Sequence, residues 1–432
     1  MNTSHQSLSR ILIGGMVGNL TEWYNFLLYG YLATVISQLF FPFHNEFLSL
    51  ILVFTVFALS FMMRPIGGIL FGWIGDRYGR QRALIYSLLM VTLPAFIIGC
   101  LPTYQTIGIA SPILLSLLRI LQGLSAGGEH TGSAVYLAEQ APNQHRSWWV
   151  SMVPASAALG ILASSLVSLI ILNSFDAETL LSWGWRVGYW IGTLFGLLSL
   201  IWRLGLPETA DFERIKTKNL TVKSPLSVLF KETKTLKNLS AVFGLASCWG
   251  VFYQILFIWM PTYLTQFQHL NHGVVLKINS SFLFLFTCLI VLMGYLTDYI
   301  NRSRLLKLTC FAIAIMAYPI FIMLSSGHFW QINIALGIYT ILFSFYIPVT
   351  FVYMVEAFPA EIRYTAFSFG FNMGLAIFGG TCPLIVTWLI RATGQLTSPA
   401  SYLLIAAVVA LCISTKISDA DTKSCDATHY PF

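Results

Sequence analysis

Charged residues are scarce in this sequence: they make up 9% of its 432 residues, whereas hydrophobic residues make up 56%. An ordinary soluble domain has about 25% charged residues and roughly 45–50% apolar residues, because its surface faces water. So few charges cannot cover a water-facing surface of this size. The composition therefore excludes a soluble globular protein and favours a protein whose surface faces lipid.

Paired cysteines are also lacking. None of the seven cysteines forms a CxxC pair, and most lie singly inside apolar runs. Such cysteines are small apolar side chains rather than disulfide or metal sites, so we expect no metal and no cofactor. The first apolar run is too long for a signal-peptide core and no small-residue cleavage site follows it, so we expect the first helix to be retained.

Long apolar runs are what the sequence has in abundance. A helix needs roughly 20 apolar residues to cross a bilayer core about 30 Å thick, and twelve spans at about 36 residues each fit this length. The runs are too continuously apolar for barrel strands. The sequence therefore predicts an all-α membrane protein with about twelve transmembrane helices. The runs begin near Ile11, Leu48, Ala83, Ile109, Trp148, Trp185, Leu239, Ile278, Leu305, Phe329, Tyr364 and Ser401.

Basic residues indicate the orientation of these helices. The net charge of +7 comes without a basic patch interleaved with aromatics, so we expect no nucleic acid partner. Positive charge favours the cytoplasmic loops. One set of alternate loops holds few basic residues, Lys277 and Arg391. The other set is rich in them, which predicts that both termini are cytoplasmic: Arg77, Arg80, Arg82, Arg146, Arg302, Arg304, Lys307, Arg363 and seven more within residues 207–238.

The two halves of the chain repeat one another. Glu139, Pro142 and Arg146 recur 217 residues later as Glu356, Pro359 and Arg363. A second set, Gly72, Asp76, Arg80 and Arg82, recurs 222 residues later as Gly294, Asp298, Arg302 and Arg304. A parallel repeat of two six-helix bundles is typical of one class of transporters, with the substrate site at the midplane between the repeats. We predict bundles at residues 1–206 and 239–416, a cytoplasmic linker at 207–238 and a short tail at 417–432.

The second run ends in the sequence GWIGDRYGRQR, residues 72–82. This stretch resembles the signature loop of the major facilitator superfamily, and its second copy has Tyr299 and Asn301 in place of the Arg and a Gly. The resemblance implies a fold of two six-helix bundles. It also implies a cytoplasmic gate, to which we assign residues of this loop and members of both repeated sets: Gly72, Asp76, Arg77, Gly79, Arg80, Glu139, Arg146, Asp298, Arg302, Glu356 and Arg363.

Other motifs narrow the resemblance. GNLTEWYNFLLYG at residues 18–30 and RILQGLSAGGE at residues 119–129 are similar to the first- and fourth-helix motifs of the metabolite:proton symporter family. Members of that family move osmolytes such as proline and betaine, or carboxylates such as citrate, 2-oxoglutarate and shikimate. The resemblance implies a multi-pass protein of the bacterial inner membrane, and we expect a monomer. The chain departs from the family's pattern at Asn25, where Asp is usual, and at His130, where an aromatic residue is usual.

Charges inside a membrane span are expensive and mark transport pathways by default. We place four at depth, all in the first half: Glu22, Arg64, Arg119 and Glu129. We expect proton coupling by Glu22, with Glu129 and His130 as further candidates. The alternatives are a Glu22–Arg119 or Arg64–Glu129 pair that only fixes packing, and a His130 that is a hydrogen-bonded packing residue. The expected substrate-binding residues lie on the same two helices and beside them: Asn19, Asn25, Tyr29, Arg119, Gln122 and Arg64.

Together these features predict a secondary transporter with no catalytic residues, whose partners are a small solute, protons and the lipid bilayer. In this hypothesis the fork of Arg119 holds a solute carboxylate, while Glu129 and Gln122 complete a polar patch and Glu129 meets the cationic end of a zwitterion. A proton-antiport exporter and a non-transporting solute sensor are the alternatives. The GxSxG pattern at residues 123–127 lies inside a span, where a nucleophile elbow has no strand-turn-helix context, so we do not expect an enzyme.

Overall fold

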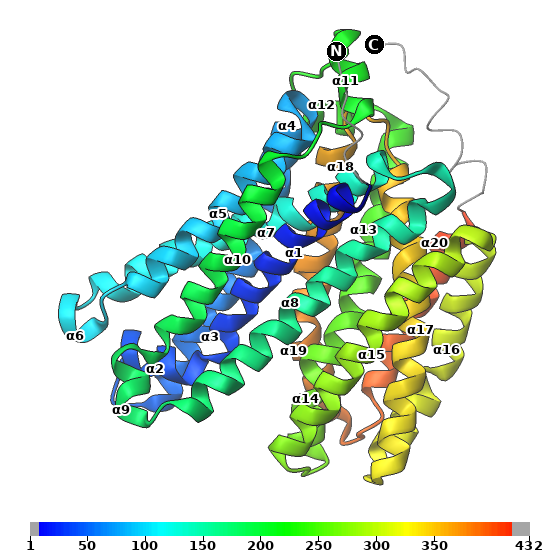
Figure 1. Ribbon diagram of the computed structural model, residues 1–432. Coiled ribbons are helices and arrows are strands. Elements are labelled where there is room, and N and C mark those ends of the chain that lie inside the picture. Colours follow the sequence, from blue (N-terminus) through cyan, green and yellow to red (C-terminus); the bar gives the residue numbers. More distant parts are fainter. Residues whose placement is uncertain (1–7, 417–432) are drawn as a thin grey trace. The chain divides into compact units, whose positions relative to one another are not determined.

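The computed structural model describes residues 8–416, and this part of the chain is 87% helical without strands (Figure 1). Ten of its helices are long and apolar enough to cross a membrane. The first helix α1 (Leu8–Tyr31) and the last helix α20 (Pro399–Thr415) complete twelve spans. The predicted all-α membrane fold is confirmed, and every predicted run begins within six residues of a helix start. The predicted tail at 417–432 lies outside the described residues.

The chain forms two compact units. Unit 1 comprises residues 1–140 and 156–223, and unit 2 comprises residues 141–155 and 224–432. The helix α8 (Arg146–Ser174) contributes its first residues to unit 2 and the remainder to unit 1. The predicted linker at 207–238 contains two short helices, α11 (Ala210–Thr217) in unit 1 and α12 (Pro225–Lys231) in unit 2.

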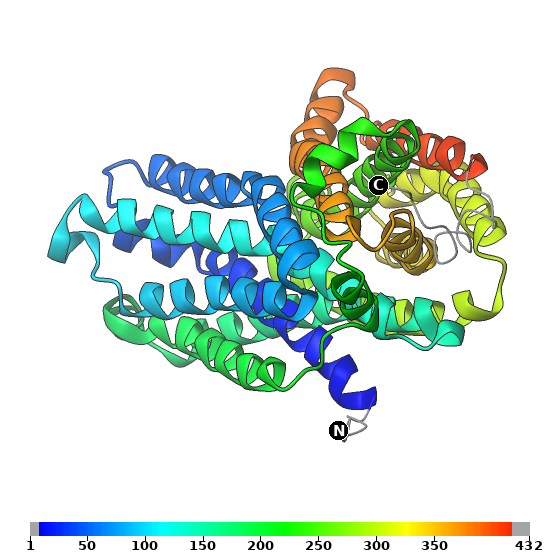
Figure 2. The same cartoon turned by 90° about the horizontal axis from the view of Figure 1, so that it is seen from above.

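In unit 1 the long helices run side by side (Figures 1 and 2), with α7 packed against α1, α4 and α5, and α10 against α1 and α5. Small residues allow this packing: a Cβ on Gly67 or Gly127 would lie 1.9 Å from a backbone oxygen of the facing helix. Besides α1, α8 and α11, the elements of unit 1 are α2 (Ala33–Phe40), α3 (Glu46–Met62), α4 (Arg64–Tyr78), α5 (Arg80–Cys100), α6 (Tyr104–Ile107), α7 (Ala110–Gln140), α9 (Ala177–Thr179), η2 (Leu180–Gly184) and α10 (Arg186–Leu204).

In unit 2, α13 packs against α18 and α20, and α16 packs against α17 and α20. Two spans of this unit contain π-helical stretches, which are rare and frequently lie at functional sites. Besides α12 and α20, the elements of unit 2 are η1 (Asn143–His145), α13 (Thr233–Tyr253), η3 (Gln254–Trp259), α14 (Met260–Thr262), η4 (Tyr263–Phe267), α15 (His272–Tyr299), α16 (Arg302–Ser325), α17 (Phe329–Glu356), α18 (Arg363–Gly374), η5 (Leu375–Gly379) and α19 (Gly380–Thr393).

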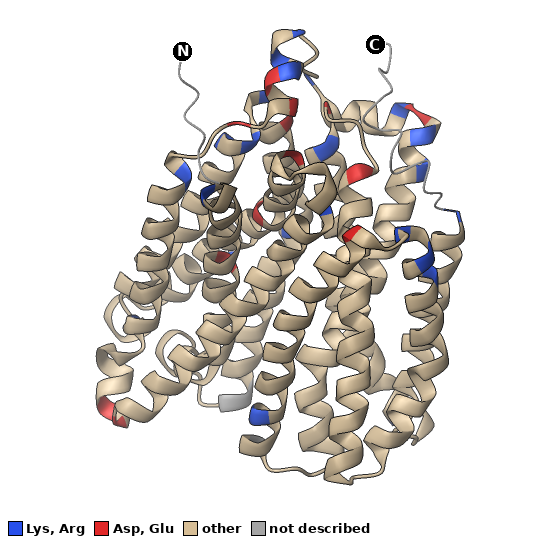
Figure 3. Cartoon of the chain, turned by 45° about the vertical axis from the view of Figure 1, so that its right-hand side comes forward, with Lys and Arg blue, Asp and Glu red and all other residues tan. Residues whose placement is uncertain are grey.

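The surface of each unit is that of a membrane protein. Large apolar side chains are exposed along the helices, among them Ile201 at 68% and Trp330 at 76%. Apolar surface on this scale is not found on soluble monomers. In each unit the charged residues gather near one end of the spanning helices and are scarce along their middle (Figure 3). The chain is therefore a multi-pass membrane protein.

Candidate transport site

Apart from the predicted gate residues, five charged side chains are buried in the spanning helices of unit 1. The four predicted ones, Glu22, Arg64, Arg119 and Glu129, are at most 1% exposed. The fifth, Arg203 near the end of α10, is fully buried and was not among the predicted site residues. Because each of these charges is costly in a low-dielectric interior, their partners decide what each of them can do.

Glu129 and Arg203 form a closed ion pair. Both Nη atoms of Arg203 donate to the Glu129 carboxylate, Nη1 at 2.7 Å from Oε2 and Nη2 to Oε1. The hydroxyls of Ser87 and Ser133 donate to the same carboxylate at 2.6 and 3.0 Å. The Glu129 carboxylate thus has four donors, so it does not form the open polar patch with Arg119 and Gln122 that we expected. Glu129 therefore pairs with Arg203 instead of Arg64, and Arg119 contacts aromatic rings and Gln122 instead of Glu22.

Arg203 also ties three helices together. Its Nε donates to the carbonyl of Gly14 at 3.1 Å and its Nη1 to that of Leu84 at 2.8 Å. A Cβ on Gly18 would lie 2.2 Å from Nη2 of Arg203, so the glycine of the first-helix motif leaves the room that the guanidinium fills. The sequence does not single out Arg203, because it lies one residue before the end of α10, where basic residues commonly mark the edge of a membrane span.

Glu22 lies in the same interior without such partners. Its side chain is 1% exposed, and neither carboxylate oxygen accepts a hydrogen bond from residues 8–416. Arg64, Glu129 and Arg203 lie within electrostatic range of it. Arg64 itself stacks on the rings of Trp23 and Phe61, with its Cζ 5.3 and 5.2 Å from their centroids. Glu22 is therefore a buried carboxylate that no hydrogen bond in the described chain holds in its charged form.

Arg119 lies further along the same face of α1, inside a shell of aromatic rings. Its Cζ is 4.4 Å from the ring centroid of Tyr29, 4.8 Å from that of Phe26 and 5.8 Å from that of Phe57. Its Nη1 donates to Oε1 of Gln122 at 2.7 Å, and its other hydrogen bonds, to two carbonyls of α1, are 3.4 and 3.5 Å long. Within residues 8–416 it contacts no carboxylate. Rings stabilise a buried cation only in part, so Arg119 is a cation without a resident anion.

The remaining predicted residues of α1 divide between two faces. The Oδ1 of Asn19 accepts a hydrogen bond from Nδ1 of His130 at 2.8 Å, and its Nδ2 donates to Oγ of Ser156 at 2.9 Å. Asn25 points the other way, toward α10: its Nδ2 donates to Thr21 O at 2.9 Å, and a Cβ on Gly192 would lie 2.1 Å from its Oδ1. The structure thus joins His130 and Asn19 to the Glu22 side of α1 and places Asn25 in helix packing.

The predicted gate residues of unit 1 converge. Arg80 pairs with Asp76 at 3.2 Å and with Glu139 at 3.2 Å, all three fully buried. Glu208, which follows α10, accepts from the backbone N–H of Arg80 at 3.0 Å, and Thr209 donates to Glu139 at 2.6 Å. Burial raises the pKa of the Glu208 carboxyl above its ordinary value, against the opposing effect of backbone N–H donors and Arg80.

The other three predicted gate residues of unit 1 form no part of this ionic network. Gly79 has φ +119°, and a Cβ there would lie 2.2 Å from Oε2 of Glu208, so this turn requires glycine. Arg77 stays outside the network and stacks on Trp73 and Tyr78. Gly72 is buried within α4.

The repeated residues of unit 2 form a second network. Arg302 contacts Glu356 at 3.1 Å and Asp298 at 3.7 Å, and Arg146 contacts Glu356 at 3.0 Å. The Asp298 carboxylate also accepts from the N–H groups of Ser147 and Trp148, at the start of α8. The Nε of Arg363 donates a hydrogen bond to the carbonyl of Phe358 at 3.2 Å. In each copy of the sequence repeat, therefore, one arginine contacts both an aspartate and a glutamate: Arg80 in unit 1 and Arg302 in unit 2.

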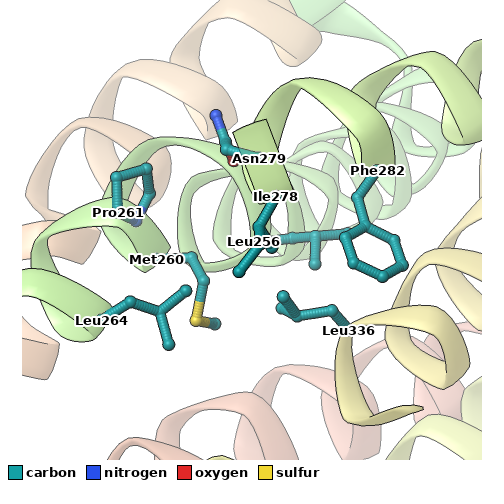
Figure 4. A pocket seen from close by; sticks show the side chains of 8 residues that line it. All are labelled: Leu256, Met260, Pro261, Leu264, Ile278, Asn279, Phe282 and Leu336. Atoms are coloured by element: carbon teal, nitrogen blue, oxygen red, sulfur yellow. The ribbon is translucent and has the colours of Figure 1, made fainter. Parts of the chain in front are cut away.

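The middle of unit 2 is aromatic rather than charged. Trp249 stacks on Tyr253, with ring centroids 5.3 Å apart, and lies against Phe343, Phe351 and Phe371. A narrow crevice in this unit (Figure 4) is apolar except for Asn279, and its free volume of about 10 Å³ has no room for a solute. It is lined by Leu256, Met260, Pro261, Leu264, Ile278, Asn279, Phe282 and Leu336.

Comparison with known proteins defines the class first. Residues 18–383 match the family model described as Major Facilitator Superfamily, so the chain belongs to this superfamily of membrane transporters. The same fold occurs in solved structures. The proton:xylose symporter XylE has a TM-score of 0.77 at 17% identity and 94% coverage of both chains. The *Escherichia coli* fucose:proton symporter FucP has a TM-score of 0.68 at 14% identity, covering 95% of this chain and 99% of its own.

Curated relatives then define the branch. The chain is 32% identical to the proline/betaine transporter of Salmonella typhimurium over 413 residues, which are 94% of this chain and 82% of the relative. It is equally similar to the glycine betaine/proline/ectoine/pipecolic acid transporter OusA of *Dickeya dadantii*. A third relative, from Staphylococcus aureus, is described as a "putative proline/betaine transporter" and is 31% identical over 400 residues, which are 92% of this chain and 86% of the relative. The resemblance to the metabolite:proton symporter family is therefore confirmed.

Proposed function

We propose that this chain is a proton-coupled symporter that takes up a small carboxylate-bearing solute across a bacterial inner membrane by alternating access, with both termini in the cytoplasm. One contrast inside unit 1 carries the proposal. Glu129 is saturated by Arg203 and two serines, whereas Glu22 accepts no hydrogen bond and Arg119 meets no carboxylate within residues 8–416.

Glu22 is the proton carrier in this mechanism. A carboxylate that is buried without hydrogen-bond donors gains little from staying charged, so it can exchange a proton once per cycle. Glu129 cannot do this without breaking the pair with Arg203, and we therefore leave it out of the proton path. His130 is the second candidate for the proton carrier, because it is hydrogen-bonded to Asn19, which lies on the same helix as Glu22.

Arg119 is the solute anchor. Its guanidinium can hold a carboxylate through two parallel hydrogen bonds, and its long bonds to the two α1 carbonyls are the contacts that a solute would replace. Proline, glycine betaine, ectoine and pipecolic acid, the solutes named for the OusA relative, each carry a carboxylate and a cationic nitrogen. We therefore favour a zwitterionic osmolyte over a purely anionic organic acid.

The test is uptake into proteoliposomes holding the purified chain, with and without an imposed inside-alkaline pH gradient. Labelled proline, glycine betaine and citrate supply carboxylates, and choline and xylose are matched solutes without one. We expect gradient-driven accumulation of a carboxylate-bearing solute that a protonophore abolishes. Accumulation of choline or xylose without competition by carboxylates would contradict the solute class. Loss of preloaded solute down the same gradient would identify an exporter.

Arg119→Lys tests the anchor separately. Lysine keeps the positive charge but loses the fork, so we expect solute affinity to fall by about tenfold or more, as for the loss of a charge-assisted hydrogen bond. The matched control is Arg391→Lys, at an exposed position near the end of α19, which should leave affinity unchanged. Equal affinity of Arg119→Lys and the unaltered chain would remove Arg119 from the solute site.

A further inference from the structure

A cationic hollow lies at one end of the helices of unit 2. Its volume is about 560 Å³, within the range of roughly 300–1,000 Å³ found for ligand pockets. Three lysines contribute to its wall, Lys234 and Lys237 from the first two turns of α13 and Lys416 just after α20. Among residues 8–416, no Asp or Glu lines it. The lining is Lys234, Lys237, Asn238, Ser240, Ala241, Tyr353, Ile413 and Lys416.

The surroundings of the lysines combine polar and apolar groups. Ser240 and Asn238 bring a hydroxyl and an amide to the wall, while Ala241 and Ile413 lie one turn deeper along α13 and α20 and are apolar. The ammonium groups of Lys237 and Lys416 contact no carboxylate within residues 8–416. The hollow thus offers cationic donors at its rim and a hydrocarbon floor, at the level where spanning helices end.

We propose that this hollow binds the phosphate headgroup of an anionic phospholipid. Lysines next to a membrane surface attract anionic lipids, and basic pockets at the cytoplasmic ends of spanning helices hold phosphate headgroups. The apolar floor favours a lipid over free phosphate, because acyl chains can lie against Ala241 and Ile413 while the phosphate meets the lysines. The simpler interpretation, that these lysines only orient the helices, accounts for their charge but not for the hollow that three helix ends form around them.

The experiment measures lipid binding to the full-length chain in neutral phosphatidylcholine nanodiscs. Dioctanoyl phosphatidylglycerol is titrated against dioctanoyl phosphatidylcholine and against inorganic phosphate, and bound lipid is counted by native mass spectrometry. We expect phosphatidylglycerol to bind at least about tenfold more tightly than phosphatidylcholine, consistent with the strength of basic clusters at a membrane surface. Inorganic phosphate should not displace it at equal concentration.

Matched variants distinguish binding in this hollow from attraction by the overall positive charge of the chain. Lys234→Gln, Lys237→Gln and Lys416→Gln together should remove the preference, and the same three changed to Arg should keep it. The control removes three other exposed lysines, Lys216, Lys218 and Lys231, and should leave the preference intact. An equal loss in the control would reduce the effect to net charge and overturn the proposal.

Two further outcomes would also overturn it. Displacement by inorganic phosphate at equal concentration would make the ligand a free anion. Residues 417–432 follow Lys416 directly and carry Asp419, Asp421 and Asp426. If the unaltered chain shows no preference and the variant with these three aspartates changed to Asn gains one, the chain's own acidic residues occupy the hollow instead of a lipid.

Discussion

Glu129 and Glu22 are both buried in unit 1, yet replacing each by glutamine should have different effects: the first should lower stability, and the second should stop proton coupling. Glu129→Gln removes the charge that compensates fully buried Arg203 and leaves one oxygen for four donors. Breaking one partner out of a buried pair costs about 3–5 kcal/mol. Glu22→Gln removes a carboxyl that accepts no hydrogen bond in residues 8–416, so stability should stay within about 1 kcal/mol. Gradient-driven accumulation should nevertheless be lost, while solute exchange continues.

The assay is thermal unfolding in one detergent, paired with uptake and exchange in proteoliposomes. The double variant Glu129→Leu, Arg203→Met should recover much of the loss, because replacing both members of a buried pair by apolar residues is often close to neutral. Gly18→Ala tests the same pair from α1, since its Cβ would lie 2.2 Å from Arg203. Gly30→Ala is its control, with only Phe57 at 3.9 Å. A stable Glu129→Gln together with an unfolded Glu22→Gln would refute the assignment of the two roles.

Three further predictions concern the network at Arg80. Asp76→Asn should slow transport severalfold while solute affinity, measured by equilibrium binding, stays unchanged; an equal loss of both would contradict a gating role. Gly79→Ala should lower the melting temperature more than Gly108→Ala, because both have positive φ but only Gly79 would place its Cβ against Glu208. Burial raises the pKa of Glu208 above its ordinary value of 4.5, so its carboxyl binds a proton more readily in the folded chain than in the unfolded chain. Its contribution to stability is therefore present below pH 4.5 and lost as the pH rises through the folded pKa, and Glu208→Gln should flatten stability over that window.

Sequence reasoning predicted what depends on composition and repetition. Apolar runs gave the helices, because only helices of that length can satisfy their backbone in lipid. The two repeated sets were assigned to one gate, and the structure brings their charged residues into contact: Asp76, Arg80 and Glu139 meet in unit 1, as Asp298, Arg302 and Glu356 do in unit 2. Their role as a gate stays a prediction.

What escaped prediction depends on which helix faces which. Helical spacing puts Asn19, Glu22 and Tyr29 on one face of a helix, but it does not show that Asn25 faces α10. Arg203 was missed for the same reason: its place near a helix end indicates a membrane edge, while its long side chain reaches Glu129, 74 residues earlier in the sequence. Side-chain reach and helix neighbours are set by long-range packing, which a periodic pattern does not contain.

The two copies of the repeat differ in how their aspartates are used, and a final prediction follows. Asp76 is fully buried beside Arg80, so its charge compensates a buried guanidinium. Asp298 accepts from two N–H groups at the start of α8, and its arginine, 3.7 Å away, is 25% exposed to solvent. Asparagine keeps one acceptor oxygen at this helix start, and the charge lost there is worth about 0.3–1 kcal/mol. Asp298→Asn should therefore destabilise the chain less than Asp76→Asn when both are unfolded thermally in one detergent, and the reverse order would show that the second copy carries the stronger ionic contact.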